Sequence, residues 1–285
     1  MPDSLPTNSK IVAAYRERTL KSAELAATAR EMFPSGITHD SRHTTPYGIY
    51  VDHAKGSRKW DVDGNEYVDY FGGHGALILG HNHEGVIAAG HHQLDKGTHF
   101  GASHPAEVEW GELVKDMVPC AERVRFTSSG TEANLMAFRL ARAFTGKSKL
   151  VRFVCHFHGW QDHVAFGAKG GVPDGPVPGV LDGIIENVVL IEPGNEDLMR
   201  ETLSSRDDIA GVILEPTGAS FGQIPVTREF VAALRDATTE NGTLLLFDEV
   251  VTGFRVSPGG AQGHYGITPD LTSLAKILSG GLPGG

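Results

Sequence analysis

Short apolar runs alternate with amphipathic segments along most of the chain. The runs are KLVRFV at 149–154, NVVLIE at 187–192, IAGVILEP at 209–216 and TLLLFDEV at 243–250. Runs this continuous predict strands that are buried on both faces, as in a parallel sheet covered by helices. The segments between them have helical spacing, most clearly residues 227–241. This alternation with short connections indicates an α/β fold with a doubly wound, mostly parallel sheet.

The beginning of the chain has a different pattern. Residues 11–33 are rich in Ala, Glu, Arg and Leu at helical spacing, which predicts a helix. Further on, the pair Asp63-Gly64 separates two short alternating segments, as in a β-hairpin. We therefore expect an N-terminal segment over residues 1–80, made of a helix and short antiparallel strands, followed by a large domain over residues 81–285.

Composition narrows the class of protein. The chain has 285 residues, of which 40% are hydrophobic, as expected for a soluble globular core. A formal net charge of -10 and the lack of a basic run argue against nucleic acid or an anionic membrane surface as a partner. Two cysteines, Cys120 and Cys155, make no disulfide framework, and no apolar run approaches the ~20 residues of a membrane span. We expect a soluble, cytoplasmic protein.

The stretch SSGTEAN at 128–134 is the first candidate for chemistry. A strand is predicted to end at Phe126, followed by a Ser/Gly turn and the start of a helix. The free amide groups of a helix start, together with Gly130 and the hydroxyls of Ser129 and Thr131, would form a cradle for an anion. The spacing matches neither dinucleotide nor triphosphate loops, so a single phosphate group is favoured. An ordinary Ser/Thr helix cap explains the same residues.

Three further groups follow predicted strands, and ligands in such sheets bind at the carboxyl ends of the strands. Asp248 and Glu249 end an apolar strand, where an unpaired charge is costly. Lys276 follows an apolar run, and a lysine near apolar walls becomes a nucleophile toward carbonyls. Phe157 offers a flat ring. Taken individually, Lys276 could equally be a surface lysine at the end of a strand, and Phe157 could equally be a core residue. Together with the cradle they indicate pyridoxal phosphate, with Asp248 paired to its protonated ring nitrogen and Glu249 in a structural contact nearby.

Five stretches carry a resemblance to a known family. They are SSGTEANLMAFRLARAFTGKSKL, FHGW, EP at 215–216, LLLFDEVVTGFR and GAQGHYGITPDLTSLAKILSGGLPGG. The chain resembles the class III aminotransferases of fold type I, and among them most the glutamate-1-semialdehyde 2,1-aminomutases and their close aminotransferase relatives. The resemblance implies a three-layer α/β sandwich and a pyridoxal-phosphate-dependent enzyme, an aminotransferase or an isomerase. It also implies a small amino-acid or amino-aldehyde substrate and a homodimer when the protein is full length.

The resemblance also implies residue roles. Lys276 would form the Schiff base and move the proton, and Asp248 would hold the ring nitrogen. Phe157 would stack on the ring, where the family usually has tyrosine, and Val250 would pack under it. The complete set of implied cofactor-binding residues is Ser129, Gly130, Thr131, Phe157, His158, Glu215, Asp248, Val250 and Lys276.

Two more residues are implied to bind the substrate. Arg42, in FPSGITHDSR, is the candidate clamp for the substrate carboxylate, a task that suits the bidentate guanidinium. A solvent-exposed loop arginine is the alternative. His74, in FGGHGALILGH, stands where the aminomutases commonly have an aromatic residue.

Two alternative functions remain open. The chain stops at Gly285, shortly after Lys276, whereas family members continue with a C-terminal domain. A truncated, non-catalytic fragment is therefore one alternative, and the activity of this chain is an open question. The second is a metal-dependent hydrolase, because the pairs His81/His83 and His156/His158 stand two residues apart. No third ligand follows at a telling spacing, so we expect no metal site.

Overall fold

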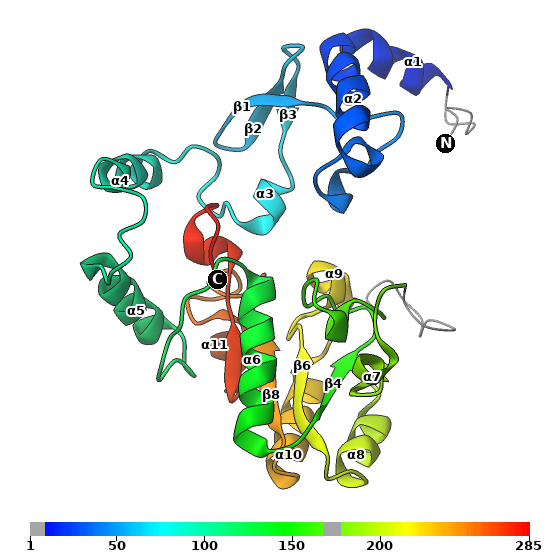
Figure 1. Ribbon diagram of the computed structural model, residues 1–285, viewed down its shortest axis with the longest axis vertical. Coiled ribbons are helices and arrows are strands. Elements are labelled where there is room, and N and C mark those ends of the chain that lie inside the picture. Colours follow the sequence, from blue (N-terminus) through cyan, green and yellow to red (C-terminus); the bar gives the residue numbers. More distant parts are fainter. Residues whose placement is uncertain (1–8, 168–177) are drawn as a thin grey trace. The chain divides into compact units, whose positions relative to one another are not determined.

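The computed structural model describes residues 9–167 and 178–285 of the chain (Figure 1). Its residues group into two compact units. The first unit consists of Met1–Gly72 and Leu79–Thr98. The second consists of Gly73–Ile78 and His99–Gly285. Because a compact unit is not by itself an independently folding domain, the boundary expected after residue 80 stays a prediction.

The first unit is built around a small antiparallel sheet in the order β1-β2-β3. Its elements are α1 (Ser9–Arg18), α2 (Leu20–Met32), η1 (Pro34–Gly36), η2 (Asp40–Arg42), β1 (Val51–Lys55), β2 (Arg58–Asp61), β3 (Glu66–Val68) and α4 (Glu84–Leu94). Between β2 and β3, Gly64 has a φ of 87°, a left-handed value that glycine adopts without strain. The predicted hairpin at Asp63-Gly64 is confirmed.

The prediction of one continuous helix over residues 11–33 is wrong, because the helix breaks at Thr19. The new helix start is capped from elsewhere in the unit. Asp63 Oδ1 accepts a hydrogen bond from Lys21 N at 2.7 Å, and its Oδ2 accepts one from Ser22 N at 3.0 Å. A carboxylate that binds the free N–H groups of a first turn stabilises a helix start there. Since the cap comes from the hairpin turn, the helical periodicity of the segment did not reveal it.

The second unit is an α/β sandwich. Its elements are α3 (Gly72–Gly75, whose first residue belongs to the first unit), α5 (Pro105–Met117), α6 (Gly130–Thr145), β4 (Lys149–Phe153), η3 (Asp162–Val164), α7 (Asp182–Ile185), β5 (Val188–Ile191), α8 (Glu196–Ser204), β6 (Ile209–Leu214), α9 (Ala219–Gly222), β7 (Ile224–Pro225), α10 (Arg228–Glu240), β8 (Leu244–Asp248), α11 (Gly260–Tyr265), β9 (Leu271–Ser273) and η4 (Lys276–Ser279).

Five parallel strands form the central sheet of this unit, in the order β5-β4-β6-β8-β9. Helix α6 covers one face, and α8 and α10 pack together over the other (Figure 1). The expected three-layer fold with a parallel sheet is thereby confirmed. Within the two described ranges, no helix is both long and apolar enough to cross a membrane.

Alternation along β8 decides which way its terminal acids point. Leu245 and Phe247 pack with α8 and α10, whereas Leu246 packs with α6. Successive side chains of a strand point to opposite faces, so Asp248 lies on the α6 side. The chain turns after Asp248, and the side chain of Glu249 is directed to the start of α11. The two adjacent carboxylates therefore have separate roles.

The strand predicted to end at Phe126 does not form. Residues 124–127 belong to no sheet; Thr127 exchanges two backbone hydrogen bonds with Gly285, at 2.7 and 2.9 Å. A strand requires a neighbouring backbone along its length. Among the described residues, Gly285 is the one whose backbone pairs with this segment. Residues 124–127 therefore form an irregular connection to α6.

Candidate functional site

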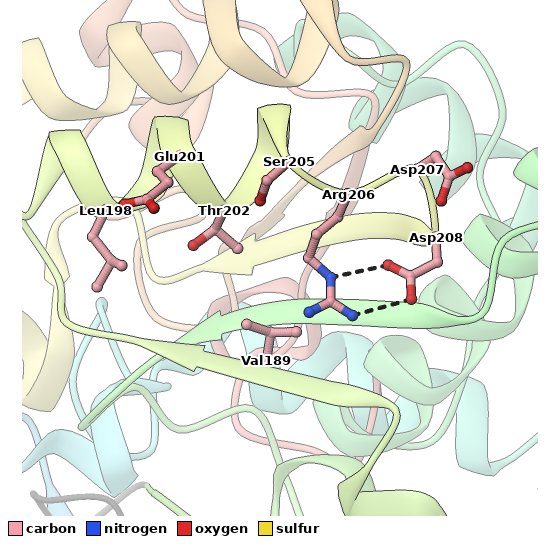
Figure 2. A pocket seen from close by; sticks show the side chains of 8 residues that line it. All are labelled: Val189, Leu198, Glu201, Thr202, Ser205, Arg206, Asp207 and Asp208. Carbon is pink, nitrogen blue, oxygen red and sulfur yellow. Dashed lines mark hydrogen bonds and ion pairs between the residues drawn. The ribbon is translucent and has the colours of Figure 1, made fainter.

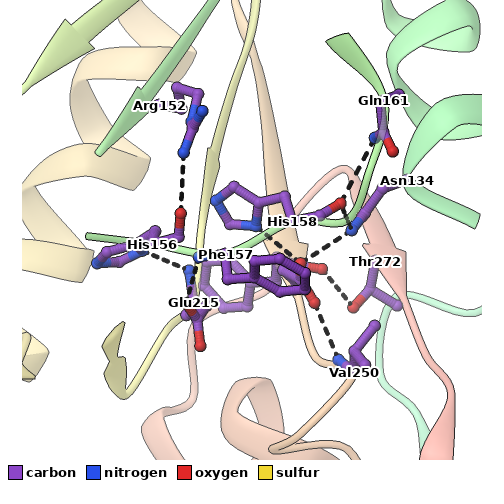
Figure 3. Close-up of polar contacts among 11 residues, drawn as sticks. Asn134, Arg152, His156, Phe157, His158, Gln161, Glu215, Val250 and Thr272 are labelled. Carbon is purple, nitrogen blue, oxygen red and sulfur yellow. Dashed lines mark hydrogen bonds and ion pairs between the residues drawn. The ribbon is translucent and has the colours of Figure 1, made fainter. Parts of the chain in front are cut away.

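Asp248 is the centre of a buried hydrogen-bond network at the carboxyl end of β8. Its donors His158, Asn134 and Val250 are labelled in Figure 3. The side chain of Asp248 is only 4% exposed. Oδ2 accepts hydrogen bonds from His158 Nδ1 at 2.7 Å and from Asn134 Nδ2 at 2.9 Å. Oδ1 accepts one from Val250 N at 3.1 Å. Three donors therefore compensate the burial of this carboxylate, and Oδ1 retains capacity for a further donor.

His158 donates its hydrogen bond to Asp248 as a neutral imidazole. Burial lowers the pKa of His158, although the nearby Asp248 carboxylate acts in the opposite direction. With the proton on Nδ1, the other ring nitrogen, Nε2, is buried and has no hydrogen-bond partner among the described residues. The ring thus orients the carboxylate without neutralising it.

Lys276 lies at the start of η4 and is partly buried. Burial lowers the pKa of its amine, against the opposing effect of Asp248 and Glu215. A Cβ atom added to Gly75 would lie 3.6 Å from Arg255 Nη2 and 4.0 Å from Lys276 Cδ, so the segment Gly73–Ile78 passes close to this lysine. An amine with reduced proton affinity is a usable nucleophile toward a carbonyl.

Glu215 joins strand β6 to the loop that follows β4. Its Oε1 accepts a hydrogen bond from Phe157 N at 2.8 Å, and its own N–H donates to His156 Nδ1 at 2.9 Å (Figure 3). Burial raises the pKa of Glu215 to about 8, with Asp248 adding to the shift and Lys276 opposing it. The carboxyl group therefore holds its proton through much of the neutral range.

This raised pKa predicts a pH-dependent stability. Since the ordinary pKa of a glutamate side chain is 4.5 and the value for folded Glu215 is about 8, the unfolded chain loses the proton first as pH rises. We expect the wild type to lose stability relative to Glu215→Gln between those two pH values, by at least about 1 kcal/mol. Urea unfolding of both proteins across this range measures the difference. Parallel stability curves would show that Glu215 ionises normally, and Glu192→Gln, at an exposed position, is the control.

The start of α6 combines a helix cap with a close approach of backbone. Ser129 Oγ accepts a hydrogen bond from Glu132 N at 3.2 Å, which makes Ser129 the N-cap. The first N–H groups of the helix, those of Gly130 and Thr131, have no partner within it. A Cβ on Gly130 would lie 2.6 Å from Val250 Cγ2. Because glycine has no side chain, Val250 can pack against the start of the helix. The cap alternative is correct for Ser129, and it leaves the backbone donors available for an anion.

The structure brings most of the predicted site residues together. Those that meet at the carboxyl edge of the sheet through the contacts above are Gly130, His158, Glu215, Asp248, Val250 and Lys276. Thr131 joins them, because a Cβ on Gly159 would lie 2.7 Å from its Oγ1. Phe157 contributes its backbone to the network, and the residue is 59% exposed. Their roles toward a cofactor stay predictions.

The two predicted substrate-binding residues lie in different units. His74 belongs to the Gly73–Ile78 segment of the second unit and has a φ of 59°. Arg42 belongs to the first unit, where its Nη1 donates to Thr38 Oγ1 at 3.0 Å. Both roles remain predictions. Asn134 and His156 were not among the predicted site residues; the signal for Asn134 was a polar residue on the buried side of a helix, four positions before Phe138.

Glu249 is structural, as expected. Its carboxylate accepts hydrogen bonds from Thr252 Oγ1 at 2.8 Å, from Ala261 N, and from Gln262 N and Nε2 at 3.2 and 3.1 Å. The buried carboxylate therefore fixes the start of α11 against the end of β8.

The substitution Glu249→Ala is expected to destabilise the fold. It leaves several buried donors without an acceptor, so we expect the free energy of unfolding to fall by about 3–5 kcal/mol. Denaturant unfolding followed by circular dichroism measures this, with Glu240→Ala at an exposed helix end as the control, expected within about 0.5 kcal/mol of wild type. A loss from Glu249→Ala as small as the control's would contradict the assignment.

Other parts of the described chain offer little chemistry. No group of three or more His, Cys, Asp or Glu side chains suited to a metal ion occurs among the described residues, which gives the hydrolase alternative no geometric support. A surface pocket of about 530 Å³ lies toward the amino ends of β5 and β6, away from Asp248 (Figure 2). Its Arg206 is paired with Asp208 through hydrogen bonds of 3.0 and 3.1 Å.

Comparison with known proteins identifies the family of this chain. Residues 39–285 match the family model "Aminotransferase class-III". The chain is 46% identical over 278 residues to glutamate-1-semialdehyde 2,1-aminomutase 1 of Staphylococcus aureus, covering 94% of this chain and 64% of that protein. An omega-transaminase from Sphaerobacter thermophilus is similar with a TM-score of 0.90 and 32% identity, covering 95% of this chain and 64% of that one. A transaminase with PLP bound has a TM-score of 0.89 and 35% identity, with 93% and 63% covered. The chain thus spans about 64% of the length of the curated relatives it matches, and it belongs to the class-III aminotransferase family.

Proposed function

We propose that this chain contains the cofactor-binding part of a pyridoxal-phosphate-dependent enzyme that moves amino groups on small amino acids or amino aldehydes. One observation carries the proposal. The buried carboxylate of Asp248 and the amine of Lys276 lie at the same edge of a parallel sheet, where burial lowers the pKa of the amine against the opposing effect of Asp248. Membership of the class-III family adds support, since a matched transaminase structure has PLP bound.

The residues present fit this cofactor. Asp248 Oδ1 receives one hydrogen bond from the described residues, from Val250 N, and can accept a second from the protonated ring nitrogen. The free N–H groups at the start of α6 suit a phosphate. Val250, admitted by Gly130, offers an apolar surface beneath a ring, and the exposed side chain of Phe157 is available for stacking.

When bound, pyridoxal phosphate supplies an electron sink for the negative charge that develops on the substrate carbon bearing the amino group. Asp248 would keep the proton on the ring nitrogen, and His158 and Asn134 hold its carboxylate in place. Lys276 Nζ, with its lowered proton affinity, would take and return a proton. Glu215 fixes the loop that carries Phe157 and His158.

Two reactions compete within this class. The aminomutase name of the relative from Staphylococcus aureus favours exchange of the amino group within one molecule, with Arg42 as the carboxylate clamp and His74 near the substrate. The structural likeness to an omega-transaminase favours transfer between two molecules. An assay with glutamate-1-semialdehyde and no added amino donor separates them, because only an aminomutase turns over under these conditions. No turnover with any amino donor would favour the non-catalytic fragment.

An absorption spectrum tests the cofactor assignment directly. The protein purified with saturating pyridoxal phosphate should be yellow, and borohydride should fix the label on the peptide that contains Lys276. Colourless protein and an unlabelled peptide would overturn the proposal.

We further infer a homodimer for the full-length protein, acting in the cytoplasm without nucleic acid or membrane as a partner. The net charge of -10 supports the absence of nucleic acid and membrane partners, because a negatively charged protein is repelled by nucleic acid and by anionic lipid. Analytical ultracentrifugation of the full-length protein tests the dimer. A monomer at micromolar concentration would contradict it.

A further inference from the structure

Asn134 is a polar residue within the apolar stripe of α6. Asn134, Phe138 and Ala141 are the buried residues of this helix, and their spacing places them on one face. Phe138 and Ala141 pack against the sheet. Asn134 is 1% exposed and lies one turn nearer the helix start, on the side of the sheet to which Asp248 points.

The side chain of Asn134 joins three segments that are distant in sequence. Its Nδ2 donates to Asp248 Oδ2 at 2.9 Å and to His158 O at 2.9 Å (Figure 3). Asn134 itself follows the turn of Ser129, Gly130 and Thr131 by one helical turn. One amide group therefore connects the candidate phosphate cradle, the end of β8 and the loop after β4.

The contacts also fix the orientation of the amide. Both neighbours are oxygen acceptors, so the opposite orientation would place Asn134 Oδ1 against a carboxylate and a carbonyl. In the observed orientation, Oδ1 is buried and has no hydrogen-bond partner among the described residues. An unsatisfied buried acceptor carries a stability cost, which suggests that this side chain is kept for something other than stability.

We propose that Asn134 is a positioning residue that turns the carboxylate of Asp248 toward the cofactor. Together with His158 it occupies Oδ2, which leaves Oδ1 directed to the ring nitrogen. It also ties that orientation to the helix whose start would hold the phosphate. The proposal rests on the proposed function, since it concerns binding of the same cofactor.

A double-mutant cycle tests it. Asn134→Ala should weaken the binding of pyridoxal phosphate about ten- to a hundredfold, because a hydrogen bond to a charged group is lost. In the Asp248→Ala background the same substitution should change the dissociation constant less than about twofold, because its target is gone. Equilibrium titration of the four proteins by absorbance gives all four constants.

Controls separate positioning from folding. Asn187→Ala removes an exposed amide that donates to Gly183 O at 2.7 Å, and its cofactor affinity should equal that of the wild type. If Asn134→Ala does not fold, Asn134→Leu restores the lost volume in the apolar stripe and enters the same cycle. Thermal unfolding of each protein without cofactor shows which variants are folded.

The outcomes are distinct. Equal weakening in both backgrounds would show that Asn134 only supports the fold, and no weakening in either would show that it does not act on the cofactor; both overturn the proposal. If the wild type itself fails to bind pyridoxal phosphate, the proposed function falls and this inference falls with it. If the wild type binds pyridoxal phosphate and the Asn134 variants bind it as tightly as the Asn187→Ala control does, this inference is wrong and the proposed function stands.

Discussion

Lys276→Ala is expected to abolish the covalent attachment of pyridoxal phosphate. Burial lowers the pKa of the Lys276 amine although the nearby carboxylate of Asp248 opposes the shift, which makes this amine the candidate nucleophile of the site. Without it, borohydride should fix no label on this peptide, and turnover should fall by about a thousandfold or more. Peptide mass spectrometry after reduction, together with an amino-transfer assay, measures both effects.

The control for this substitution is Lys149→Ala. Lys149 stands at the amino end of β4, where its Nζ lies 3.5 Å from Asp208 Oδ2, so its removal should change neither labelling nor turnover. The cofactor should still bind reversibly to Lys276→Ala, because the helix start and Asp248 are intact. Full labelling of the Lys276→Ala protein at another lysine, with activity retained, would contradict the assignment.

Asp248→Asn should reduce turnover by about two to four orders of magnitude while the protein remains folded. The amide has nearly the same size as the carboxylate, and its oxygen can still accept hydrogen bonds from His158 or Asn134. What it lacks is the negative charge that would hold a proton on the ring nitrogen. Steady-state kinetics and the pH dependence of the bound cofactor's absorption measure the loss.

Asp208→Asn removes a partly exposed carboxylate that is paired with Arg206 and lies outside the site, and it is the matched control. Its activity should be close to that of the wild type. If Asp248→Asn retains wild-type turnover, the charge of Asp248 is not needed and the proposed role of this network is wrong. Unfolding of both variants by denaturant separates a lost charge from a lost fold.

Elements whose residues meet local requirements could be read from the sequence. The helix expected over residues 227–241 is observed as Arg228–Glu240, with the hydroxyl of Thr227 accepting a hydrogen bond from Phe230 N. Strands β4, β5, β6 and β8 were predictable because continuous apolar runs need burial on both faces. The position of Lys276 and Asp248 at the same edge of the sheet followed from the rule that parallel strands open their sites at one edge.

Other features depend on groups that come from distant parts of the chain. The break at Thr19 arises because Asp63 caps the helix that follows it. The segment before α6 does not form a strand, because a strand depends on neighbouring backbone. Asn134 is another example: as part of a sequence motif it is one more polar residue at a helix start, and only packing of α6 on the sheet brings its amide to Asp248.

Periodicity and spacing along the chain thus predicted strands β4, β5, β6 and β8, and also the lysine, the acid and the glycine-hydroxyl turn expected at their carboxyl edge. The tertiary structure was needed to identify the donors that hold each of the two neighbouring carboxylates. Asp248 meets His158 and Asn134, whereas Glu249 binds the start of α11. The physical reason is that a buried charge is stabilised by donors close in space, and those donors come from loops and helices far away in sequence.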